Sequence, residues 1–127
     1  MAVRTIGAAC LCGFFILLSL AGPAWGQGPS PAQEQEFIDA RDALQSARGA
    51  KAETLAANHF QKATEFLGMA ESSRSLKDAT PFAHASRLAR AYAELAEAVA
   101  ELKAEEAKLA AAGDALRRVK AEFEGLK

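Results

Sequence analysis

The feature that most constrains this chain is a long apolar edge that begins near Pro81 and meets no further proline. Apolar residues, with occasional replacements, recur there at alternating steps of three and four residues, the seam of a left-handed coiled coil or bundle helix. A continuous helix from Pro81 to Glu124 would be about 66 Å long. The seam positions are Ala85, Leu88, Tyr92, Leu95, Val99, Leu102, Glu106, Leu109, Gly113 and Leu116.

The rest of the chain is rich in alanine and poor in β-branched residues, a composition that favours helix. One helix is predicted to start after Ser30-Pro31 and to stop at Gly49. A second starts near Thr54 or is capped by Asn58. Their stripes, again at steps of three and four, are Phe37, Ala40, Leu44 and Ala47, and Phe60, Ala63, Leu67 and Ala70. We therefore expect an all-α fold, a small three-helix antiparallel bundle with a long, coiled-coil-like C-terminal helix.

The start of the last helix is predicted from Thr80 as the N-cap and Pro81 as the first helical residue. The two shorter helices, about 25 Å each, should bury the seam from Ala85 to about Leu102. The surplus seam then protrudes from about residue 100. Its members, the candidate interaction residues, are Leu102, Leu109, Leu116, Val119 and Phe123.

Two arrangements would account for this surplus. The protruding part pairs with another protein chain, or the helix breaks at Gly113 with Asp114 capping a new one. We favour a continuous or mildly kinked helix, because charged pairs of opposite sign follow at helical spacing from Asp114 onward. Since Glu106 and Gly113 weaken apolar packing at the seam, we expect a protein partner or weak self-association rather than an obligate zipper.

Residues 1–26 have the features of a cleaved signal peptide: Arg4, an apolar run, and Ala24-Trp25-Gly26 before a cleavage point at Gln27. The run is shorter than the roughly 20 residues a spanning helix needs, so an uncleaved anchor is the lesser alternative and no stable membrane insertion is expected after cleavage. Cys10 and Cys12 lack the context of a lipid-attachment site. A flexible leader is expected at 27–36 and the helical domain at 37–127, exported to the periplasm or cell envelope of a bacterium.

Charge and side-chain chemistry exclude several functions. Removal of residues 1–26 leaves 14 basic against 16 acidic residues, which argues against a nucleic-acid partner. His59 and His84 have no second ligand three or four residues on, and Glu105 with Glu106 shows no sign of a catalytic cleft. We find no catalytic, cofactor-binding or metal-ligating residues and predict that the protein is not an enzyme.

Two stretches, "DARDALQSARGAKAETLAANHFQKATEFLGMA" and "ASRLARAYAELAEAVAE", resemble an alanine-rich helical family of the bacterial envelope that is classified as a domain of unknown function. The resemblance covers about Phe37 to Val99. Its members often precede an OmpA-like peptidoglycan-binding domain, and many are lipoproteins. The sequence printed here has no OmpA-like part and no cysteine placed for lipidation, so neither property is expected of it.

These observations lead to two functional hypotheses. The first is a structural or protein-interaction module of the cell envelope, acting through the protruding helix. The alternative is a periplasmic, chaperone-like binder of an apolar ligand or unfolded segment, with Phe60, Phe66 and Phe123 as possible contacts.

Overall fold

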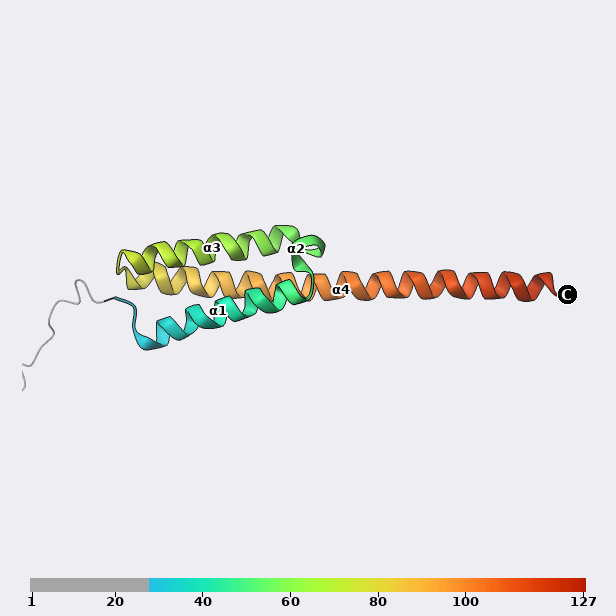
Figure 1. The fold of residues 1–127 in the computed structure, drawn as a ribbon, viewed down its shortest axis with the longest axis horizontal. Helices are drawn as coiled ribbons and strands as arrows, with labels where there is room; N and C mark the ends of the chain where they lie inside the picture. Colours follow the sequence, from blue (N-terminus) through green and yellow to red (C-terminus); the bar gives the residue numbers. More distant parts are fainter. Residues whose placement is uncertain (1–27) are drawn as a thin grey trace, which may run out of the picture.

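The computed structural model describes residues 28–127, and every regular element in that range is an α-helix. The helices are α1 (Pro31–Gly49), α2 (Ala52–Leu55), α3 (Ala57–Ser75) and α4 (Ala79–Gly125). Figure 1 shows α1 and α3 lying along the first half of α4, while the second half continues alone. The predicted all-α class and long C-terminal helix are confirmed. The predicted signal peptide, with both cysteines, lies outside the described residues.

A capping box starts α1 earlier than the predicted domain boundary. The Gln33 backbone N–H donates to the Ser30 hydroxyl (3.3 Å), and the Ser30 N–H donates to the Gln33 side chain (2.8 Å). With Pro31 at the first helical position, this pairing satisfies N–H groups that a helix start otherwise leaves free. Residues 31–36, expected in a flexible leader, therefore form the first turns of α1.

The connection from α1 to α3 contains the single turn α2, which the sequence did not predict. The chain ends α1 at Gly49 as expected and turns through Lys51, whose φ is 62°. Ala52 and Ala56, at either end of α2, are buried at 0% and 4% exposure. The next helix begins at Ala57 without a side-chain cap, so neither Thr54 nor Asn58 starts it as predicted.

A Schellman motif joins α3 to α4. The Lys77 N–H donates to the Arg74 carbonyl (3.0 Å) and the Asp78 N–H donates to the Ser73 carbonyl (2.9 Å), with Lys77 at a φ of 57°. This pattern closes α3 on its own last carbonyls, and α4 begins at once at Ala79 with Asp78 as N-cap. The prediction of Thr80 as N-cap was wrong by two residues.

The face of α4 that packs on the other helices is a stripe of alanines, not the predicted leucine seam. Its buried members are Phe82, Ala83, Ala85, Ser86, Ala89, Ala93, Ala96 and Ala100. Of the seam, only Ala85 is fully buried, whereas Leu95 is 43% exposed and Leu102 60% exposed. Burial of the seam up to Leu102 was thus a wrong prediction. Alanine lets α1 and α3 approach α4 closely on one side, and the larger leucines are displaced to the rim and the outer surface.

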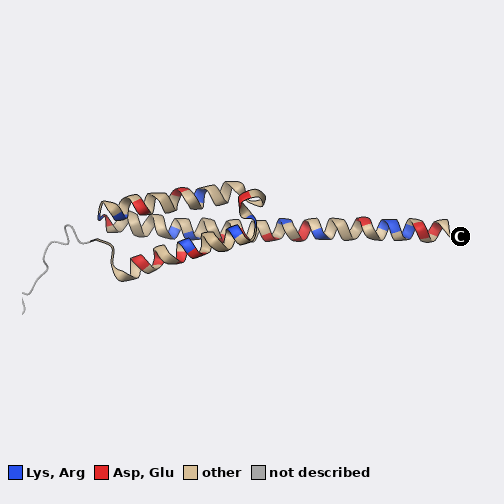
Figure 2. Cartoon of the chain, in the orientation of Figure 1, with Lys and Arg blue, Asp and Glu red and all other residues tan. Residues whose placement is uncertain are grey.

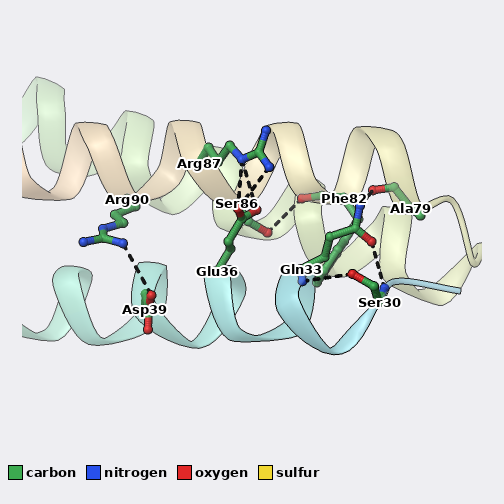
Figure 3. Close-up of polar contacts among 9 residues, drawn as sticks. All are labelled: Ser30, Gln33, Glu36, Asp39, Ala79, Phe82, Ser86, Arg87 and Arg90. Carbon is green, nitrogen blue, oxygen red and sulfur yellow. Dashed lines mark hydrogen bonds and ion pairs between the residues drawn. The ribbon is translucent and has the colours of Figure 1, made fainter.

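Surface polar contacts fix α1 along α4, as Figure 3 shows. Both Nε and Nη2 of Arg87 donate to the Glu36 carboxylate at 3.0–3.1 Å, and Arg90 reaches Asp39 at 3.4 Å. A hydrogen bond to Glu94 raises the pKa of Arg90 above its ordinary value. Exposed pairs of this kind contribute about 0.2–1 kcal/mol each, so they set the helix orientation more than the stability.

Candidate interaction surface on the last helix

Residues 101–125 of α4, hereafter the distal arm, extend past the bundle into solvent. The last alanine buried by the other helices is Ala100, at 0% exposure. The amine of Lys103 donates to the Leu55 carbonyl (2.6 Å), the most distal hydrogen bond between α4 and another helix in the described chain. Beyond it the arm runs unaccompanied for roughly 33 Å at 1.5 Å per residue, as Figure 1 shows.

Large apolar side chains recur on the arm at every seventh residue. We call Leu95, Leu102, Leu109, Leu116 and Phe123 the leucine row. Their exposed fractions are 43%, 60%, 75%, 70% and 64% in that order. A row with this spacing drifts by only about 20° per heptad around a straight helix. Its members therefore share one face of α4.

Four of the five predicted interaction residues belong to this row, and the fifth, Val119, lies one turn from Leu116 and is 61% exposed. The arrangement brings all five onto one exposed helix. Sequence reasoning missed Leu95, which extends the row back over the bundle. Leu95 could have been found from the sequence, because it lies seven residues after Leu88 and seven residues before Leu102.

The opposite side of the arm carries alanines, followed by Arg118 and Glu122, and no large apolar residue. Ala104, Ala107, Ala111 and Ala115 continue the line of Ala93, Ala96 and Ala100 at the same helical angle. This side offers little apolar area, so substitutions on it serve as controls for substitutions in the leucine row.

Acidic and basic residues are interspersed along the arm (Figure 2). Glu105 and Glu106 form an acidic pair, Arg117, Arg118 and Lys120 form a basic group, and Glu122 and Glu124 follow near the end. Within the helix Lys108 pairs with Glu105 at 2.6 Å, and Arg117 pairs with Asp114. Asp114 therefore begins the charged pairs as the sequence indicated, and its partner lies three residues on.

Gly113 does not interrupt the arm. The residue lies within α4, and a Cβ added there would meet nothing within 4 Å. The continuous helix that the sequence favoured is confirmed, and the break at Gly113 does not occur.

Other candidate sites do not assemble. His84 is exposed, whereas His59 is half-buried with an Nδ1 that has no hydrogen-bond partner. Within residues 28–127, no three His, Cys, Asp or Glu side chains are grouped as a metal site would require.

The three phenylalanines named for the alternative hypothesis are also apart. Phe66 stacks on Tyr92 at 5.5 Å, and the Arg48 guanidinium lies over Phe60. Phe123 is far out on the arm. A groove of about 470 Å³ does open between α1 and α3, and its lining includes Ile38, Leu44 and Leu67 beside charged residues.

None of the helices in residues 28–127 combines the length and the apolar character that crossing a membrane requires. No family model matches the sequence, and no curated protein or solved structure matches it. The resemblance to the envelope family therefore stays a prediction.

Proposed function

We propose that this protein is a non-enzymatic helical component of the bacterial cell envelope that acts as a structural or protein-interaction module. In this proposal α1, α3 and the first half of α4 work as a three-helix antiparallel bundle that holds α4 in place. The distal arm then presents the leucine row to another protein chain. Export rests on the predicted signal peptide, and the envelope location on the resemblance described above.

The observation that carries the proposal is the exposure of the leucine row on a continuous helix. Full burial of a Leu or Phe side chain is worth about 1.5–3 kcal/mol, and four row members on the arm remain 60–75% exposed. Large apolar side chains left exposed together on one helix face favour an interaction site. Because α4 is anchored in the bundle, the arm begins from an existing helix and needs no new nucleation step.

The experiment is a double substitution, Leu109→Glu with Leu116→Glu, in the chain from Gln27 onward. The matched control is Ala107→Glu with Ala111→Glu on the opposite side of the same arm. We expect the first variant to lose its complexes, in sedimentation of the purified chain or of envelope extract, and the control to keep them. Unchanged complexes in the leucine variant, with the bundle still folded, would overturn the proposal.

A second candidate is the chaperone-like binder, supported by the groove between α1 and α3. A dye whose fluorescence rises in apolar surroundings would respond to the monomer if this groove binds apolar segments. Substitution of the 46%-exposed Ile38 by Glu would then remove the response. A monomer that gives no dye response rules this candidate out.

A further inference from the structure

We propose that the chain bound at the leucine row is a second copy of this protein, with the two distal arms antiparallel and Leu109 of each opposite Gly113 of the other. This inference rests on the proposed function, since it names the partner of the same surface. From Leu95 to Phe123 the row spans four heptads, and a heptad repeat of this length favours a coiled coil.

The residues between the row members decide the orientation. In a two-stranded coiled coil the seam holds the leucines and a second set of positions, which here are Val99, Glu106, Gly113 and Lys120. In a parallel pair, Glu106 would face Glu106 of the second copy, and Lys120 would face Lys120 of the second copy. Gly113 against Gly113 would leave a void. All three layers are unfavourable, so packing and charge disfavour a parallel pair.

Antiparallel pairing removes each of these conflicts. A leucine of one arm then meets an interleaved position of the other. Leu109 fills the space above Gly113 of the second copy, and Leu116 packs on the stem of Glu106. Leu102 packs on the stem of Lys120, and Phe123 meets the exposed part of Val99, whose other side packs on the bundle. Every large row member on the arm gains a partner, and no like charges face each other in the seam.

Charge complementarity selects this register. In it, Glu106 of each copy lies between Arg117 and Lys120 of the other, and symmetry forms the contact twice. Glu106 and Lys120 make no ion pair within residues 28–127, so both charges are available. Lys103 lies on the same side of α4 as Glu106, but its amine already donates to the Leu55 carbonyl. A shift by one heptad would instead place Glu106 beside Glu124.

The bundle leaves room for this pairing. The end of the second arm would lie along residues 97–104 of α4, where the row is open: Leu95 is 43% exposed and Leu102 60% exposed. α1 and α3 cover the alanine stripe on the other side of α4. The glycine and the charged seam positions limit the apolar area, so the pair should be in reversible exchange with monomer at micromolar concentrations.

Sedimentation equilibrium on residues 27–127 tests the proposal. The unmodified chain should show a concentration-dependent doubling of mass. Glu106→Lys alone, and Arg117→Glu with Lys120→Glu alone, should each weaken association at least tenfold, because each places like charges together. An equimolar mixture of the two variants should restore it, since in the mixed pair every contact again joins opposite charges.

Every other outcome contradicts either the antiparallel register or the identity of the partner. Variants that associate as the unmodified chain does would exclude the antiparallel register, because a parallel pair already has like charges facing in the seam. A chain that stays monomeric at all concentrations would exclude a second copy as the partner. In that case, photo-crosslinks from position 109 to a different protein would still support the proposed function. If such crosslinks are also absent, both the proposed function and the pairing of two copies are wrong.

Discussion

The alanine stripe of α4 can be tested by the substitution Ala96→Leu. Ala96 is 0% exposed and packs with Ala47, Ala52, Ala56 and Ala100, where α1 and α2 come closest to α4. Leucine adds three carbon atoms at a fully buried position, and overpacking of this kind costs about 1–3 kcal/mol. For a domain of this size, each kcal/mol corresponds to a fall in Tm of about 4–8 °C.

Two matched variants separate this stripe from the leucine seam. Ala107→Leu makes the same change eleven residues further along the same side of α4, where the residue is exposed, so the bundle should keep its Tm. Leu102→Ala should lower the free energy of unfolding by less than about 1 kcal/mol, because most of that side chain is already in water. A fully buried leucine would instead cost about 2–5 kcal/mol.

Tyr92 provides the assay. It is the sole tyrosine and stacks on Phe66 within the bundle, so its near-ultraviolet signal reports the bundle separately from the arm. The reasoning is refuted if Ala96→Leu unfolds at the temperature of the unmodified chain while Leu102→Ala loses several kcal/mol. That pair of results would place the leucine seam, and not the alanine stripe, against α1 and α3.

Three further substitutions have expected outcomes. Phe82→Ala should lower the free energy of unfolding, measured in urea, by about 3–5 kcal/mol. Phe82 is 0% exposed, and its ring lies 5.5 Å from that of Phe37. A loss below about 1 kcal/mol would show that this end of the core is not packed. Lys77→Gly should stabilise the chain by up to about 1 kcal/mol, because a left-handed φ costs about 1–2 kcal/mol for a residue with a side chain; a lower urea midpoint would contradict the turn geometry. Gly113→Ala should strengthen the arm by about 0.5–1 kcal/mol, seen as slower amide exchange around residue 113; unchanged or faster exchange would contradict a continuous helix there.

The sequence predicted the helix content and the ends of α1 because the signals there are local. Ser30 and Pro31 start α1 through a capping box that involves only near neighbours, and Gly49 is the last residue of the helix. The turns before α3 and α4 were missed for a related reason. Lys51 and Lys77 hold the left-handed conformations that usually call for glycine, so no residue type marked these positions.

The orientation of α4 could not be read from its own pattern. The leucines at heptad spacing and the alanines Ala89, Ala93, Ala96 and Ala100 define two stripes on α4, and apolarity alone favours the leucines. Close approach of two helices on one side favours alanine instead, which is a property of α1 and α3 together. The exposure of Leu109 and Leu116 was predictable, because only the lengths of the helices decide it.

The central claim is that a protein chain binds the distal arm along the leucine row. A scan in bacterial cells that produce the protein, with one photo-crosslinking residue at a time from 102 to 123, tests it most directly. The account predicts maxima of crosslinking yield at 102, 109, 116 and 123 and minima at the alanine positions 104, 107, 111 and 115. Uniformly absent crosslinks, or maxima on the alanine side, would contradict it.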